Sequence, residues 1–194
     1  MEMRVEIHEE PVTTLAEYAS VPIAFEVNWI LELTVCNNGL DGFTLTKRRL
    51  DAPYIKDYDA SKGESPVHWA KRFDVSNWGL LVARIEGQRV GGAVIAFNTD
   101  GLAMLEGRDD LAVLWDIRVT PEARGQGVGA ALFRAAEAWA KTQGCRQLKI
   151  ETQNINLPAC RFYARQGCVL GAINRFAYPE LPDEVQLFWY KELA

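Results

Sequence analysis

The chain has 194 residues, of which 48% are hydrophobic and 24% are charged, as in an ordinary folded protein. This balance excludes a disordered chain, a fibrous repeat and a small scaffold held together by disulfides. Its 21 basic and 26 acidic residues give a net charge of −5. That charge disfavours binding along a nucleic-acid backbone and favours a cationic partner.

The expected location follows from what the sequence lacks. No run approaches the roughly 18 consecutive apolar residues of a membrane span. The first ten residues have neither the basic nor the apolar region of a signal peptide. The four cysteines form no C-x-x-C pair and the two histidines lie far apart, which predicts reduced thiols and no metal site, with a Cys160–Cys168 disulfide as the alternative. We therefore expect a cytoplasmic protein with no membrane contact.

The first third of the chain is expected to mix strands with irregular segments. Alternating apolar side chains predict a strand at the start, and strands over 25–36 and 42–50 flank the turn-prone NNGLDG. Residues 51–66 are rich in acid, Pro and Gly, so we expect a surface loop there. Ser65-Pro66 is placed to cap and begin a helix that runs to about Phe73.

The rest of the chain alternates strands and helices. Residues 128–142 repeat apolar side chains on one helical face, and Gly144 follows where a C-terminal cap belongs. The other expected elements are a hairpin over 78–98 turning at 86–88, a strand over 111–119, a strand over 147–152, a helix over 157–167 capped by Asn156, and strands over 168–178 and 185–193. This order predicts an α/β chain with a mixed sheet flanked by helices, in one domain over 1–194.

A glycine-rich turn joins the strand over 111–119 to the next helix. Its sequence, V-T-P-E-A-R-G-Q-G-V-G, ends with alternate glycines at 125, 127 and 129. Glycine lets the backbone approach a ligand closely, and backbone N–H groups at a helix start attract phosphate. Arg124 can add a charge-assisted hydrogen bond. The segment therefore predicts a pyrophosphate cradle; the alternative is a tight strand-to-helix turn with no ligand.

The segment does not match two other glycine-rich motifs that bind phosphate groups, the P-loop and the dinucleotide-binding turn. A P-loop requires Lys-Ser or Lys-Thr after its last glycine, and neither follows Gly129. A dinucleotide-binding turn requires G-x-G-x-x-G, whereas residues 125–130 read GQGVGA.

Two motifs on these elements carry a resemblance to a known family. Arg124-x-x-Gly127-x-Gly129 resembles the acyl-CoA-binding motif R/Q-x-x-G-x-G/A of the GNAT superfamily of acetyltransferases. The run over 151–156, ETQNIN, followed by Ala159, Phe162-Tyr163 and Gly167-Cys168, is similar to that family's second motif. The resemblance covers residues 75 to 192.

The resemblance implies a GNAT-like N-acyltransferase fold in which two parallel strands, here 111–119 and 148–152, splay apart around acetyl-CoA. Residues 76–194 are then the acetyl-CoA-binding core and residues 1–75 the acceptor side. The segments DAPYIKDYD, WDIRVTPEARGQGVG, ETQNINLPACRFY and FWYKEL further resemble streptothricin N-acetyltransferases. Because the first of these lies outside the cofactor motifs, it indicates a shared acceptor site.

The same resemblance implies roles for the residues that match the motifs. Backbone groups of Ile117 and Val119 pair with the pantetheine arm, and Asn156 and Ala159 contact the cofactor. Tyr163 protonates the departing CoA thiolate, with a core aromatic as the alternative role. Backbone N–H groups hold the pyrophosphate at Arg124, Gly125, Gln126, Gly127, Val128 and Gly129.

The reaction also needs a proton acceptor. An amine with a pKa of about 10 is protonated at pH 7, so its proton must be removed before it attacks the thioester. Glu151 and Asp116 are the candidates, acting directly or through water; alternatively, the two anions only bind the cationic amine. Cys160 and Cys168 have no histidine nearby in sequence, so a covalent acyl-enzyme is not expected.

The acceptor pocket is expected around residues 53–59, with Tyr54, Asp57, Trp78 and Trp115 in contact with substrate. A solvated charged loop is the alternative for the acidic residues. The implied activity is acetylation of a small cationic antibiotic, which confers resistance. The alternatives are another amine acceptor (a polyamine, an aminoglycoside or a protein N-terminus) and a silent acyl-CoA-binding module. By analogy with the family, a homodimer is an expected state.

Overall fold

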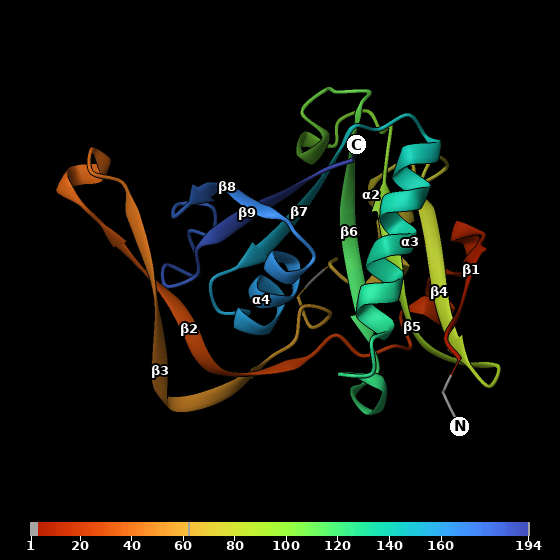
Figure 1. Ribbon diagram of the computed structural model, residues 1–194, viewed down its shortest axis with the longest axis horizontal. Coiled ribbons are helices and arrows are strands. Elements are labelled where there is room, and N and C mark those ends of the chain that lie inside the picture. Colours follow the sequence, from red (N-terminus) through yellow and green to blue (C-terminus); the bar gives the residue numbers. More distant parts are fainter. Residues whose placement is uncertain (1–3, 62, 194) are drawn as a thin grey trace. The chain divides into compact units, whose positions relative to one another are not determined.

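The computed structural model describes residues 4–61 and 63–193, and these form two compact units (Figure 1). Unit 1 takes its described residues from 1–24, 57–150 and 191–194; unit 2 comprises 25–56 and 151–190. Each unit contains residues from before and after position 75, the expected boundary between the acceptor side and the cofactor core. The units therefore do not follow the expected division into an acceptor side and a cofactor core, and the single domain stays a prediction.

The strands of unit 1 form a mixed sheet. They lie in the order β1 (Glu6–Glu10), β4 (Gly79–Ile85), β5 (Gln88–Ala96), β6 (Leu111–Val119) and β7 (Gln147–Gln153), the last of which runs on into unit 2. The first three pairings are antiparallel. The pairing of β6 with β7 is parallel, because helix α3 (Val128–Thr142) connects them. The expected α/β class with a mixed sheet is confirmed; the divergence of β6 and β7 stays a prediction.

Local sequence explains how unit 1 is connected. Glu86 and Gly87 both have positive φ, 50° and 78°, as the two-residue turn of the β4–β5 hairpin requires. Helix α3 packs against β4, β5 and β6 and buries Val128, Leu132, Phe133, Ala136 and Ala140. Gly144, with a φ of 81°, follows the helix in the left-handed conformation. The expected hairpin and helix are thus confirmed.

The segment after residue 64 departs from the expected helix. Pro66–His68 form a 3₁₀ turn, and only Trp69–Arg72 (α2) are α-helical. Ser65 occupies the N-cap position, but its side chain makes no cap hydrogen bond. The buried Trp69 instead anchors the segment, because its ring N–H donates to the Glu64 carbonyl at 2.7 Å. The other short helices of unit 1 are η1 (Val12–Thr14), α1 (Leu15–Tyr18), η4 (Ala103–Leu105) and η5 (Pro121–Ala123).

Unit 2 contains a long two-stranded ribbon and a helix-hairpin group. Strands β2 (Phe25–Val35) and β3 (Phe43–Lys56) pair antiparallel around the turn η2 (Asn37–Gly39). Helix α4 (Leu157–Arg165) precedes β8 (Val169–Asn174) and β9 (Gln186–Glu192), which also pair antiparallel. Val27 and Ile30 of β2 pack on Ile155 in the apolar core of this unit.

The expected loop over 51–66 is wrong for its first six residues, which continue β3 through Lys56. They pair with the start of β2, since Lys56 lies opposite Phe25 and Tyr54 opposite Val27. Asp51 and Pro53 lie where the register shifts, because the pairing passes directly from Trp29↔Arg49 to Val27↔Tyr54. Irregularities of this kind tolerate proline in a strand.

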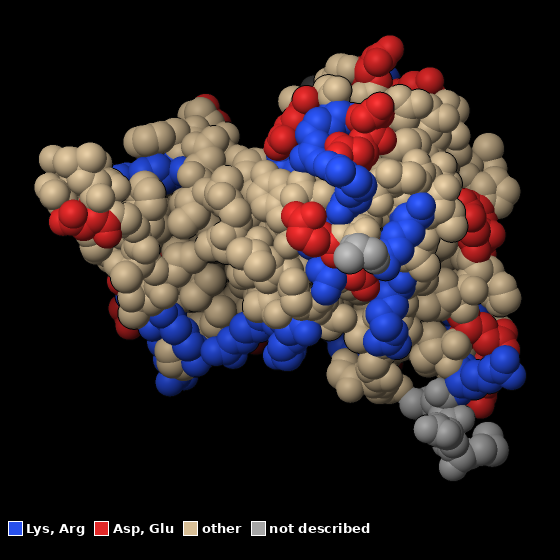
Figure 2. All heavy atoms as spheres, turned by 45° about the horizontal axis from the view of Figure 1, so that its top comes forward, with Lys and Arg blue, Asp and Glu red and all other residues tan. Residues whose placement is uncertain are grey.

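The surface of the ribbon is basic. Figure 2 shows Lys and Arg side chains gathered along the edge over β2 and β3, and β3 itself carries exposed Lys47, Arg48 and Arg49. Arg48 forms an ion pair with Glu32 at 2.7 Å, and the Lys47 ammonium lies 3.7 Å from the centre of the Trp29 ring. Among the described residues, no helix is long and apolar enough to cross a membrane.

Candidate functional site

The turn before α3 has the backbone geometry of an anion cradle. Gly125 and Gly127 adopt φ values of +76° and +83°, and Gly127 is the N-cap residue of α3. A Cβ atom built on either would meet no heavy atom of the described residues within 4 Å. The first N–H groups of a helix have no partner within the helix and attract negative charge. The strand–turn–helix arrangement is thus confirmed, and its open side fits a phosphate.

Side chains around the cradle fasten it to β6. The Arg124 guanidinium donates to the Val119 carbonyl at 3.0 Å and to the Ala24 carbonyl at 3.4 Å. Gln126 donates to the Glu122 carbonyl at 2.6 Å. These bonds shape the turn, and the contact of Arg124 with phosphate stays a prediction. On β6, Ile117 and Val119 pair with β5, and their pairing with pantetheine also stays a prediction.

Asp116 lies in a buried ion pair. Its carboxylate accepts hydrogen bonds from Arg118 at 2.9 and 2.7 Å and another from the Tyr18 hydroxyl. The Asp116 and Arg118 side chains are 7% and 1% exposed. Burial alone would lower the pKa of Arg118, but the hydrogen bonds and charge of Asp116 outweigh it and raise that pKa above its usual value. Both Asp116 oxygens are thus engaged in the folded protein, and its role as the base stays a prediction.

The two tryptophans expected at the acceptor differ in burial. Trp78 is 4% exposed, and its ring N–H donates to the Thr99 hydroxyl at 2.8 Å. The ring of Trp78 therefore packs in the core, and its contact with substrate stays a prediction. Trp115 is partly buried, with its ring 5.4 Å from that of Trp78, and its contact with substrate stays a prediction.

In unit 2, Glu151 belongs to a polar cluster that sequence reasoning missed. Its Oε1 accepts hydrogen bonds from the Tyr178 hydroxyl at 2.5 Å and from Gln153 Nε2 at 3.2 Å. Gln153 Nε2 also donates to the Tyr178 hydroxyl at 2.7 Å. The sequence could have placed Gln153 beside Glu151, because residues two positions apart lie on the same face of a strand. Tyr178 gave no such signal, since it follows β8 in an irregular segment.

Helix α4 and its N-cap residue account for three of the expected site residues. The Asn156 Oδ1 accepts the backbone N–H of Ala159 at 3.1 Å, which confirms the expected cap. Tyr163 is 5% exposed, and its ring centre lies 5.2 Å from that of Phe162. The cofactor contacts of Asn156 and Ala159 and the acid role of Tyr163 stay predictions.

The four cysteines are present as thiols. Cys160 is 2% exposed and lies 3.6 Å from the Thr152 hydroxyl. Burial raises the pKa of its thiol to about 11, although the contact with Thr152 opposes this. A thiol with so high a pKa is a poor nucleophile at neutral pH, which supports direct transfer.

Replacing Cys160 by alanine is expected to leave turnover within about twofold and to change how stability depends on pH. The folded state holds the thiol proton more tightly than the unfolded chain, in which the pKa is near 9.0. This stabilisation is complete below pH 9 and is lost as the pH rises to about 11, at a cost of about 2 kcal/mol. Urea unfolding at pH 8 and pH 10.5 measures the difference. An equal fall in the wild type and the variant would contradict the assignment.

The expected acceptor residues fall in different units. Tyr54 of β3 is 42% exposed and belongs to unit 2. Partial burial raises its pKa, helped by the negative charges of Glu184 and Asp183. Asp57 belongs to unit 1, and its carboxylate accepts the backbone N–H of Asp59 at 3.0 Å. Both substrate contacts stay predictions.

Unit 1 thus brings together the cradle, Ile117, Val119, Asp116, Trp78, Trp115 and Asp57. Unit 2 brings together Tyr54, Glu151, Asn156, Ala159 and Tyr163. Among the described residues, no group of three or more His, Cys, Asp or Glu side chains could hold a metal ion.

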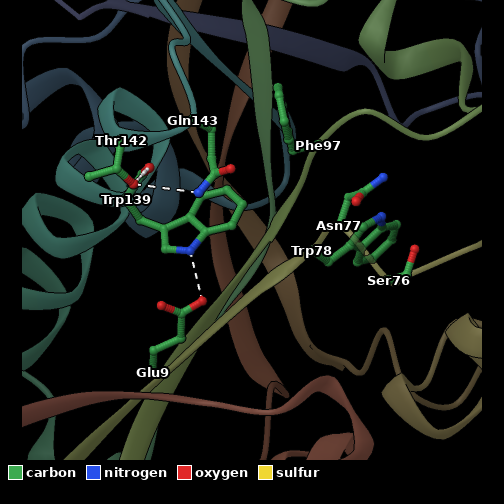
Figure 3. Close-up of a pocket in the computed structure, with 8 residues that line it drawn as sticks. All are labelled: Glu9, Ser76, Asn77, Trp78, Phe97, Trp139, Thr142 and Gln143. Carbon is green, nitrogen blue, oxygen red and sulfur yellow. Dashed lines mark hydrogen bonds between the residues drawn. The ribbon is translucent and has the colours of Figure 1, made fainter.

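A separate cavity of about 290 Å³ lies in unit 1, at the end of α3 opposite Gly127 (Figure 3). In Figure 3 Trp139 reaches from α3 toward Glu9, and its ring N–H donates to the Glu9 carboxylate at 2.8 Å. The cavity is lined by Glu9, Ser76, Asn77, Trp78, Phe97, Trp139, Thr142 and Gln143. Because it lies away from the cradle, we do not assign it to the candidate site.

Comparison with known proteins agrees with this geometry. Residues 46–168 match the Acetyltransferase (GNAT) family. The chain is 31% identical to streptothricin acetyltransferase A of Bacillus subtilis over 150 residues, 76% of this chain and 79% of that protein. It is 32% identical to a streptothricin acetyltransferase of Escherichia coli over 154 residues, 77% and 76% of the two chains. A solved acetyltransferase of Bacillus anthracis in complex with acetyl coenzyme A superposes with a TM-score of 0.75 over the full length of both chains, at 26% identity.

Proposed function

Because the chain belongs to the GNAT acetyltransferase family and is therefore an N-acetyltransferase, we propose that it transfers the acetyl group of acetyl-CoA to an amine of streptothricin, most directly the β-lysine amine. Acetylation removes a positive charge that the drug needs to bind RNA. The cell that makes the protein would thereby become resistant. We place the reaction in the cytoplasm, with no metal, and keep a homodimer as the proposed assembly.

The observation that carries the proposal is the open, left-handed glycine turn at the start of α3. It supplies backbone N–H groups and a helix dipole to a pyrophosphate, and the space in front of the glycines leaves room for one. Acetyl-CoA brings the activated acetyl thioester. The relative from Bacillus anthracis was solved in complex with acetyl coenzyme A, which supports the same cofactor here.

The proposed chemistry is a direct transfer that needs one base and one acid. Glu151 takes a proton from the ammonium group, directly or through water, and the neutral amine then attacks the thioester carbonyl. The new C–N bond forms and the C–S bond breaks as Tyr163 gives its proton to the leaving sulfur, and the second proton of the amine nitrogen then passes to the Tyr163 phenolate. Among the two base candidates we favour Glu151, because both oxygens of Asp116 are held by Arg118.

Mass spectrometry of streptothricin incubated with the purified protein and acetyl-CoA tests the proposal. We expect a gain of one acetyl group on the drug and an equal release of CoA thiol, both dependent on the protein. Release of CoA without acetylated drug would discard streptothricin, and a panel of polyamines, aminoglycosides and peptide N-termini would then be tested. Neither product, with acetyl-CoA still bound, would favour a silent acyl-CoA-binding module.

Replacing Glu151 by glutamine is expected to lower turnover about tenfold at pH 7 and far less at pH 9.5. At high pH the amine is already neutral in part, so the missing base matters less. Rate measurements across this range in the wild type and in Glu151→Gln give the two profiles. Tyr178→Phe should give a smaller loss of the same form, since its hydroxyl binds the Glu151 carboxylate. A loss that is constant with pH would mean that Glu151 only binds the amine.

A further inference from the structure

Among the described residues of unit 1, Arg118 is the most enclosed charged group. Its side chain is 1% exposed and binds two carboxylates. Besides Asp116, it donates to Asp59 through Nη1 at 2.8 Å and Nη2 at 3.2 Å. Nη1 also donates to the Val21 carbonyl at 3.1 Å, and the guanidinium carbon lies 5.0 Å from the centre of the Tyr18 ring. One side chain therefore joins three segments that are distant in sequence.

Arg118 lies between the expected cofactor residues and binds a loop that carries an expected acceptor residue. It lies on β6 between Ile117 and Val119, the residues expected to meet the pantetheine arm. Its partner Asp59 lies in the loop over 57–61, and the N–H of Asp59 is in turn held by the carboxylate of Asp57, an expected acceptor residue. The cofactor strand and the acceptor loop are thus fastened to each other within unit 1.

The charges of this cluster do not cancel. One guanidinium faces two carboxylates, which leaves a formal charge of −1 on the group. The Asp59 side chain is 22% exposed, whereas that of Asp116 is 7% exposed. The excess negative charge is therefore exposed to solvent at Asp59, in the loop over 57–61. A negative site of this kind attracts a cationic amine.

We propose that Arg118 and Asp59 form a positioning clip that holds the loop over 57–61 against β6 and so sets the affinity for the amine acceptor. This inference rests on the proposed function and assigns neither residue a chemical step. Arg118 is a poor site for the test, because its removal would leave two carboxylates without their cation and destabilise the fold. Asp59, which is partly exposed, is the better choice.

Asp59→Asn is expected to raise the KM for streptothricin about tenfold while kcat and the Kd for acetyl-CoA stay within about twofold. Asp59→Glu keeps the ion pair and should bring the KM back to within about threefold of the wild type. Asp100→Asn, which removes one exposed carboxylate elsewhere in unit 1, is the matched control and should change nothing. Hydrogen exchange of residues 57–61 should become faster only in Asp59→Asn.

The outcomes separate the clip from the proposed function. An unchanged KM in Asp59→Asn would overturn the clip, as would unchanged exchange in the loop. Equal losses of amine and acetyl-CoA affinity with a lower melting temperature would reduce it to a structural ion pair, which also overturns it. If the wild type does not acetylate streptothricin, the proposed substrate fails. The clip is then judged by loop exchange and by the KM for whichever amine the panel identifies.

Discussion

Gly127→Val is expected to weaken acetyl-CoA binding at least about a hundred-fold while the protein still folds. Gly127 has a φ of +83°, and the space beside it is open. A valine side chain would project into that space, in front of the N–H groups that begin α3. Calorimetric titration with acetyl-CoA measures the loss, and an unchanged affinity would contradict the cradle.

A matched glycine separates this effect from backbone strain. Gly101 has a φ of +75° and open space around its Cβ direction, yet it lies in the turn after β5. Gly101→Val should therefore cost similar stability, about 1–3 kcal/mol, because valine is strained at positive φ. Its affinity for acetyl-CoA should remain normal. If both variants lost the cofactor equally, strain and not the cradle would be the cause.

Tyr163→Phe is expected to lower kcat about a hundred-fold and to change the Kd for acetyl-CoA by less than about threefold. The substitution removes the hydroxyl proposed to protonate the leaving thiolate and keeps the ring that packs in α4. Steady-state rates and calorimetry on the same preparation measure the two quantities.

Tyr190→Phe on β9 is the control for losing a phenol in unit 2. It should retain its rate, since no chemical role falls to it. Unchanged turnover in Tyr163→Phe would remove Tyr163 as the acid. A comparable loss in Tyr190→Phe would point to a general effect on the unit.

Much of the candidate site was predictable because it depends on short-range patterns. The cradle needs glycines at alternate positions between a strand and an amphipathic helix, and each of those features is local. The cap by Asn156 is local as well, since its partner is the N–H three residues later. The type and position of such elements follow from neighbouring residues, and tertiary packing then supplies most of their stability.

The features that local patterns did not reveal share a different cause. Asp51 and Pro53 suggested a loop, but pairing with residues more than twenty positions earlier extends β3 past them. Trp78 packs in the core with its ring N–H on Thr99, a partner 21 residues away in sequence. In each case a partner distant in sequence overrode the local preference.

By itself, therefore, the sequence determined the order of strands and helices, the glycine cradle, the capped helix that carries Tyr163 and the family. Only the tertiary structure decided which partners engage each of the two carboxylates. Asp116 meets Tyr18 from 98 residues away, and Glu151 meets Tyr178 from 27 residues away. The physical reason is that the burial and hydrogen bonding of an ionisable group depend on the residues that the fold places beside it. Local sequence patterns do not identify those residues.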